Sequence, residues 1–145
     1  MLRTMLRSKI HRATVTGADL DYVGSVSIDP ALLELADIAV NEQVHVLNID
    51  TGARFTTYAI EGSDGEICLN GAAAHLAAPG HRVIVLTYAA VESDELAGFE
   101  PTVVHVDTLN RPVDEETARA QAGERRYVTP ALATTSQAAR APLGG

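Results

Sequence analysis

The dipeptide Gly24-Ser25 interrupts a stretch that otherwise favours a β-strand, and its residue types allow chemistry on the backbone itself. The preceding Tyr22 and Val23 favour an extended conformation, whereas a glycine within a strand marks a bulge or a close approach to the main chain. In a strained turn, the Ser25 hydroxyl can attack the Gly24 carbonyl and exchange the peptide bond for an ester. Elimination from this ester, followed by hydrolysis with loss of ammonia, leaves a pyruvoyl group at a new N-terminus. A side chain on residue 24 would crowd the attack and exclude strained φ values.

The simpler interpretation of the same dipeptide is a bulge glycine beside a surface serine. Gly-Ser is common in turns, and the dipeptide alone favours this interpretation. Other parts of the chain therefore have to decide between a harmless bulge and a self-cleavage site.

The segment RFTTYAI, residues 54–60, combines two side chains that suit a carboxylate substrate. Arg54 can bind a carboxylate through two hydrogen bonds, and Tyr58 can act as a general acid. Their separation of four residues places both on one face of a strand. Thr57 falls on the opposite face, so its participation would need a bulge or a site at a subunit boundary. In isolation, an exposed arginine and a half-buried tyrosine on an ordinary hairpin are the simpler explanation.

The segment NGAAAH contains a weak signal of anion binding. Asn70 and Gly71 predict a turn, and the small side chains of Ala72 and Ala73 leave the backbone amides uncovered. A helix that begins in this way can bind an anion at its N-terminus. Tight helix packing explains the same residues.

The segment SKIHR contains a second weak signal, because Lys9 and His11 share a strand face by alternation. Both side chains could meet an anionic ligand. Solvated basic residues on a surface strand are the commoner explanation.

Short segments of β-strand pattern, separated by turn signals, must position these residues. Asp29 and Pro30 predict the start of a short helix over 30–36, and 71–77 predict one or two helical turns. Gly17–Asp19 predict a turn, and the sequence DTG at 50–52 predicts a hairpin. The predicted strands are 9–16, 22–28, 43–50, 54–60, 66–70, 81–91 and, as the last strand, 101–107. Such short strands with two small helices indicate a mainly β fold, a compact barrel with insertions.

Composition limits the class of protein. With 145 residues, 46% of them hydrophobic, the chain forms one domain and a tail. The net charge of −8 disfavours nucleic-acid binding, a swapped-hairpin DNA-binding barrel included. Cys68 is the only cysteine, which excludes an intrachain disulfide and predicts a buried small apolar residue. The five histidines are scattered without the spacing of metal ligands, so no metal is expected.

No secretory or membrane-spanning segment is expected. The basic N-terminal stretch MLRTMLRSKIHR lacks an apolar region, and the longest apolar run elsewhere, VIVL, is too short to cross a bilayer. These features predict a cytoplasmic protein that does not bind membranes.

The segments LRTMLRSKIHRATVT, DYVGSVSID, RFTTYAI and NGAAAH, in this order and spacing, closely resemble the pyruvoyl-dependent aspartate 1-decarboxylases. The resemblance covers roughly residues 1 to 110. It implies a double-psi β-barrel over residues 1–115, with 116–145 as a disordered tail. It also implies a homotetramer with active sites between subunits, and decarboxylation of L-aspartate to β-alanine for the synthesis of pantothenate and coenzyme A.

The resemblance also implies the roles of individual residues. The chain would cut itself into a β chain, 1–24, and an α chain, 25–145, whose first residue, Ser25, becomes the pyruvoyl cofactor that forms a Schiff base with the substrate. Tyr58 would be the proton donor. The residues implied in processing are Tyr22, Gly24, Ser25, Thr57 and Asn70. The residues implied in substrate binding are Lys9, His11, Arg54, Thr57, Gly71, Ala72 and Ala73.

One alternative stays open at this point. The same barrel, left uncut, would keep Arg54 and NGAAAH and act as a binding module for small anions or as an interaction module. Whether cleavage is spontaneous or needs a maturation factor is also open, and nothing in the sequence indicates such a factor.

Overall fold

The computed structural model describes residues 1–122 of the chain. The predicted fold class is confirmed at the level of a mainly β protein with small helices. The strands are β1 (Leu2–Thr14), β2 (Gly17–Asp19), β3 (Ser25–Ile28), β4 (Gln43–Asn48), β5 (Arg54–Glu61), β6 (Ile67–Asn70), β7 (Arg82–Glu92), β8 (Thr102–Val106) and β9 (Pro112–Val113). The helices are α1 (Pro30–Ala36), the 3-10 helices η1 (Gly71–His75) and η2 (Ser93–Gly98), and α2 (Glu115–Ala122).

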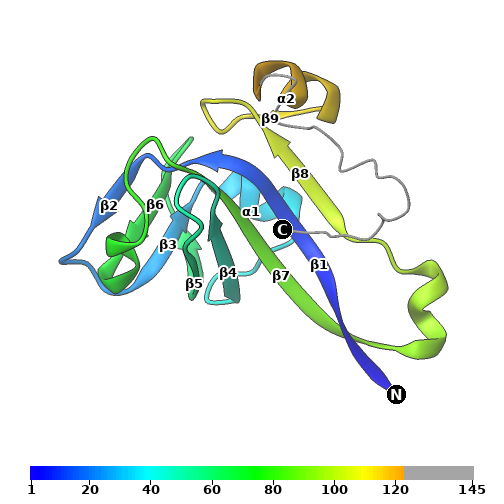
Figure 1. The fold of residues 1–145 in the computed structure, drawn as a ribbon. Helices are drawn as coiled ribbons and strands as arrows, with labels where there is room; N and C mark the ends of the chain where they lie inside the picture. Colours follow the sequence, from blue (N-terminus) through cyan, green and yellow to red (C-terminus); the bar gives the residue numbers. More distant parts are fainter. Residues whose placement is uncertain (123–145) are drawn as a thin grey trace.

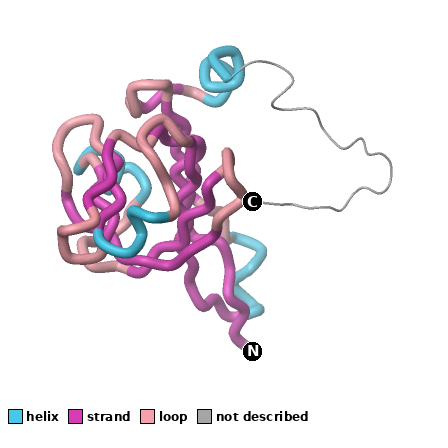
Figure 2. The backbone as a smooth tube through the Cα atoms, turned by 60° about the vertical axis from the view of Figure 1, so that its left-hand side comes forward, coloured by secondary structure: helices cyan, strands magenta, loops and turns pink. Residues whose placement is uncertain are grey.

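The nine strands form one mixed sheet in the order β2-β6-β3-β5-β4-β7-β1-β8-β9. Three strand pairs are parallel: β3 with β5, β1 with β8 and β2 with β6. The long strands β1 and β7 pair along almost their whole length and project together past the other strands (Figures 1 and 2). This order places β1, the N-terminal strand, in the interior of the sheet.

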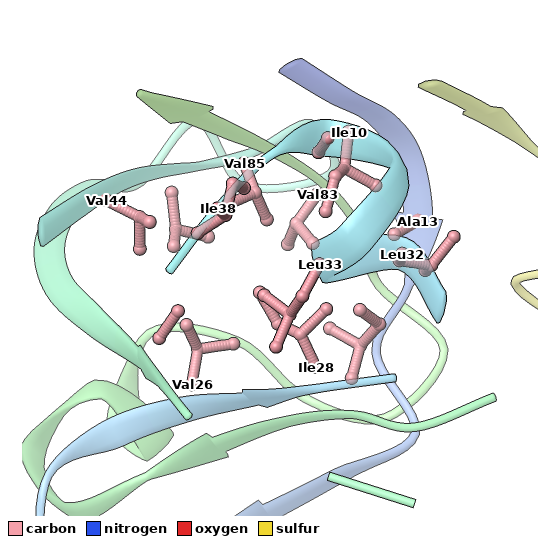
Figure 3. Close-up of a cluster of buried hydrophobic side chains, with 14 of the residues drawn as sticks. Ile10, Ala13, Val26, Ile28, Leu32, Leu33, Ile38, Val44, Val83 and Val85 are labelled. Carbon is pink, nitrogen blue, oxygen red and sulfur yellow. The ribbon is translucent and has the colours of Figure 1, made fainter. Parts of the chain in front are cut away.

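One continuous apolar core lies beneath α1 and the strands around it. Side chains from β1, β3, β4 and β7 meet there, and Leu32 and Leu33 of α1 point into the same cluster (Figure 3). Ile10, Val26 and Val85 are fully buried in it. Without tryptophan, the chain fills this core with branched aliphatic side chains, as its composition predicts.

Local signals predicted two elements correctly. Helix α1 begins at Pro30, and the Asp29 carboxylate accepts a hydrogen bond from the Ala31 amide at 2.8 Å. The β4–β5 hairpin turns at residues 50–52, where Gly52 has φ +83°. Strand β7 is buried on both faces from Val83 to Thr87, as its apolar sequence predicts.

Three predictions about the strands were wrong. Gly17–Asp19 is not a turn but strand β2, because it pairs with β6, a partner distant in sequence. Tyr22 and Val23 lie in the turn before β3, which begins at Ser25, so the predicted strand 22–28 loses its first half. β8 is not the last strand, because β9 pairs with it.

Helix α2 corrects the predicted disorder of residues 116–145 at its start. The Asp114 carboxylate accepts a hydrogen bond from the Thr117 amide at 2.7 Å, and Ala118 is 7% exposed. An N-cap and one buried contact are enough to order this helix. The rest of the predicted tail lies outside the described residues.

The helices of residues 1–122 are all too short or too polar to cross a bilayer.

Candidate active site

Ser25 is the first residue of β3 and is almost completely buried, at 1% exposure. Its Oγ donates to the Val23 carbonyl at 3.4 Å and accepts from Asn70 Nδ2 at 2.8 Å. Ser25 and Asn70 are also partners in the antiparallel β3–β6 ladder. A surface serine at a bulge, the simpler interpretation of the sequence, is therefore wrong.

Asn70 is the centre of a small polar network on β3 and β6. Besides Ser25, its Nδ2 donates to Ser27 Oγ at 3.0 Å, and its Oδ1 accepts from Cys68 Sγ at 3.4 Å. Asn70 is 3% exposed, and its side chain makes no cap for η1 because these contacts occupy it.

The sequence did not predict Cys68 or Ser27 as members of this network. Cys68 is half-buried and donates a hydrogen bond, so it is not simply a buried apolar residue. The available signal was the period of two in both strands, which sets Ser25 and Ser27 on one face opposite Asn70 and Cys68.

Gly71, rather than Gly24, is the glycine that the geometry requires. Gly71 has φ +66°, and a Cβ there would lie 2.7 Å from the Gly24 Cα and 3.1 Å from the Tyr22 carbonyl oxygen. A Cβ at Gly24 would meet only the Asn70 carbonyl oxygen at 3.9 Å, and Gly24 has no positive φ. The prediction that Gly24 allows a strained φ is therefore wrong. The close contact instead comes from Gly71, whose backbone packs directly on the 22–24 turn.

Tyr58 lies next to Ser25 in the sheet. Val26 pairs with Ala59 in the parallel β3–β5 ladder, so the preceding residues, Ser25 and Tyr58, are neighbours on adjacent strands. Arg54 shares the face of Tyr58, as predicted, but four residues along a strand separate them by roughly 13 Å.

Thr57 points away from that face, as ideal alternation predicts. It pairs with the buried Val44 in a β4–β5 ladder without a register shift, so no bulge turns it toward Tyr58.

Lys9 and His11 lie on β1, far from Ser25. The sheet order places four strand-to-strand steps between β3 and β1, roughly 19 Å along the sheet. The rings of His11 and His105 meet edge to face, with centroids 5.6 Å apart. Burial, together with Lys9, His105 and Arg12, lowers the pKa of His11 to about 4, so it is neutral at pH 7.

Lys9, Arg54 and Tyr58 nevertheless share one face of the sheet. The ladders pair Arg54 with Leu47, Leu47 with Ile84, and Lys9 with Leu86, and paired residues share a face. Between the polar residues lies a second apolar cluster, separate from the core. It consists of the buried Leu47, Ile84 and Leu86 with the partly buried Leu6 and Ile49.

Comparison with known proteins shows which proteins carry this arrangement. The family model described as aspartate decarboxylase matches residues 1–113. The chain belongs to the aspartate decarboxylase family.

Individual relatives agree with the family match. The chain is 61% identical over 115 residues to aspartate 1-decarboxylase 1 of Gloeobacter violaceus, an alignment that covers 78% of this chain and 98% of the relative. It is 56% identical over 128 residues to an aspartate 1-decarboxylase of Myxococcus xanthus, covering 87% and 98% of the two chains. It is 53% identical over 116 residues to that of Thermoanaerobacter pseudethanolicus, covering 79% and 99%.

In this member of the aspartate decarboxylase family, the predicted site residues fall into two groups. Ser25, Gly24, Asn70 and Gly71 meet at one point, with the Tyr22 carbonyl and Tyr58 beside them. Lys9, His11 and Arg54 do not reach that point within one chain. Ala72 and Ala73 follow Gly71 in η1, a single 3-10 segment of five residues.

Within residues 1–122, no three side chains of the types that bind metals converge on a common point.

Proposed function

We propose that this chain decarboxylates L-aspartate to β-alanine with a pyruvoyl group that it makes from its own Ser25. As a member of the aspartate decarboxylase family, it is a carboxy-lyase. The observation that carries the proposal is the buried Ser25 hydroxyl, held between Asn70 Nδ2 and the Val23 carbonyl directly after Gly24.

The residues around Ser25 fit the formation of this cofactor. Attack of Oγ on the Gly24 carbonyl carbon breaks the Gly24–Ser25 peptide bond and forms an ester, with the hydroxyl proton passing to the released amine. Loss of the Ser25 α-proton then breaks the Cβ–O bond and frees the Gly24 carboxylate. Addition of water and loss of ammonia leave the keto group. Asn70 Nδ2 donates to the attacking oxygen, and the Gly71 backbone holds the 22–24 turn against it.

The substrate would be bound by charge and protonated by Tyr58. The guanidinium of Arg54 and the ammonium of Lys9 suit the two carboxylates of aspartate. The pyruvoyl group supplies an electron sink for the electrons left by carbon dioxide. Tyr58, next to Ser25 in the sheet, is placed to deliver a proton to the substrate Cα. We assign the backbone amides of Gly71, Ala72 and Ala73 to the rest of the pocket, with His11 near Lys9 and Thr57 assisting processing.

We further propose that the sheet closes as a double-psi barrel and that four copies assemble with the sites between subunits. Lys9 and Arg54 are too far from Ser25 to serve it within one chain. They share their face with the apolar cluster around Leu47 and Leu86. A second copy packed on this face would bury that cluster and bring basic side chains to the Ser25 of its neighbour.

Intact mass spectrometry of the purified chain tests the proposal. We expect two fragments, 1–24 and 25–145, with the larger one lighter by one ammonia than simple hydrolysis would give. The Ser25→Ala chain is the matched control and should remain one uncut, folded and inactive chain.

Other outcomes of this measurement have distinct meanings. A single uncut mass for the parent, together with absence of β-alanine formation after prolonged warming, would support the uncut anion-binding module instead. Fragments without the loss of ammonia would mean cleavage without cofactor formation.

A further inference from the structure

The thiol of Cys68 stands at the end of a hydrogen-bond chain that leads to the scissile residue. It donates to Asn70 Oδ1 at 3.4 Å, and Asn70 Nδ2 donates to Ser25 Oγ and Ser27 Oγ at 2.8 and 3.0 Å. Asn70 and both serines are buried. The side-chain amide thus uses both of its N–H groups and its oxygen within this network.

Only one of these partners distinguishes the two ends of the amide. A hydroxyl can donate or accept, so Ser25 and Ser27 would each tolerate Asn70 with its oxygen and nitrogen exchanged. Cys68 donates to the amide oxygen, and the exchange would set an N–H group against the S–H. Burial, together with the carboxylates of Glu66 and Asp19, raises the pKa of this thiol, so it keeps its proton at neutral pH.

The orientation of Asn70 decides which electron pair of Ser25 is free. With Nδ2–H directed at one lone pair of Oγ, and the hydroxyl proton directed at the Val23 carbonyl, one lone pair remains for attack on Gly24. With the amide exchanged, the hydroxyl would donate to Asn70 instead, and this arrangement would be lost.

We propose that Cys68 is a positioning residue for self-cleavage, which fixes the Asn70 amide so that its nitrogen faces Ser25 Oγ. The inference rests on the proposed cleavage between Gly24 and Ser25. Gly17 leaves room for the thiol, because a Cβ there would come within 3.3 Å of Sγ.

The test follows the rate of cleavage in purified full-length chains, by the fraction of cut chain on a denaturing gel over time. Cys68→Ala removes the donor, Cys68→Val removes it while keeping an apolar β-branched side chain, and Cys68→Ser restores a donor. We expect the alanine and valine variants to cleave about fivefold more slowly, the factor that corresponds to about 1 kcal/mol for one hydrogen bond. The serine variant should cleave at close to the parent rate.

A second measurement separates positioning from stability. The same three substitutions are made in the Ser25→Ala chain, which cannot cut itself, and their thermal unfolding midpoints are compared. Slower cleavage that follows the midpoints would indicate a structural role and overturn the inference. It is also overturned if Cys68→Ala cleaves like the parent, or if Cys68→Ser is as slow as Cys68→Ala. If the parent chain never cleaves, the proposed function itself fails, and the inference fails with it.

Discussion

The two groups of site residues differ in how complete they are within one chain. Around Ser25, the partners come from adjacent strands and are joined by hydrogen bonds of 2.8 to 3.4 Å. Lys9 and Arg54 instead lie on strands separated by β4 and β7, with buried leucine and isoleucine side chains between them. We call the first region the scissile cluster and the second the basic face.

This difference indicates that the two halves of the chemistry have different requirements. The scissile cluster has what a single folded chain needs to cut itself. The basic face has charges but no partner within the chain for a substrate held at Ser25. Making the cofactor is therefore expected to depend on the fold of one chain, and using it on contact between chains.

The largest expected effect that separates the two regions is on turnover in Tyr58→Phe. Its hydroxyl is needed for protonation of the substrate but has no hydrogen bond to the scissile cluster among the described residues. We expect normal cleavage and a rate of β-alanine formation lower by about 10²–10⁴-fold, the usual contribution of one general acid. Tyr88→Phe, on the same sheet face and bonded to His45, is the matched control. Parent-like turnover in processed Tyr58→Phe would show that the proton donor is another group.

Gly71→Ala should produce the converse result. The new Cβ must move away from the Gly24 Cα, and a displacement of about 1 Å at a reacting centre costs roughly 10²-fold in rate. We expect cleavage of a folded chain to slow by that order. The control is Gly52→Ala, at a glycine that also has positive φ but no atom within 4 Å of an added Cβ. Equal slowing in both variants would mean that general backbone strain, and not contact with Gly24, is responsible.

Arg54→Ala tests the basic face more directly. This variant should cleave normally and lose aspartate turnover by about 10–100-fold, since a charge-assisted hydrogen bond contributes roughly 1.5–3 kcal/mol. Co-expression with the Ser25→Ala chain should restore part of the activity, because mixed assemblies then place an intact Arg54 beside a processed neighbour. Failure of this mixture to regain activity, with mixed assembly demonstrated, would place Arg54 and Ser25 of one site in the same chain.

The smallest expected effect concerns His11 and the pH dependence of stability. Its pKa is lowered from 6.5 to about 4 in the folded chain, first by burial and then by Lys9, His105 and Arg12. Between pH 6.5 and 4 the unfolded chain therefore binds more protons, so this contribution to stability is complete above 6.5 and lost as the pH falls toward 4. Asp50, whose pKa is lowered mainly by a backbone hydrogen bond from Arg82, loses its contribution only at lower pH.

Thermal unfolding midpoints between pH 4 and 7 measure this contribution. The decline of the midpoint should be shallower in His11→Gln than in the parent. His75→Gln serves to correct for the loss of a histidine elsewhere. Identical pH profiles for His11→Gln and the parent would show that His11 titrates alike in the folded and unfolded chains.

Local signals carried most of what the sequence could predict. The Asp29-Pro30 cap, the 50–52 hairpin and the shared face of Arg54 and Tyr58 each depend on residues close in sequence. The chemistry at Ser25 was predicted through resemblance to a family, since the dipeptide alone favoured a bulge.

Features that depend on distant segments were missed for a physical reason. Strand β2 exists because it pairs with β6, and the need for glycine at position 71 comes from its contact with Gly24. Neither backbone approach leaves a pattern in one stretch of sequence. The hydrogen bond from Cys68 to Asn70 was missed in the same way, since its meaning depends on the position of Ser25 on the facing strand.

Strand β1 lies between β7 and β8, yet it belongs to the segment that precedes the proposed cut. A cut after Gly24 therefore leaves residues 1–24 clasped inside the sheet by backbone pairing on both sides. Folding of the intact chain is unimolecular, whereas recovery of the cut protein from full denaturation requires two separate polypeptides to find each other. Maturation would thus be a one-way event in the life of the molecule: the chain must fold first and cut second, and the memory of that order is lost once the two pieces are separated.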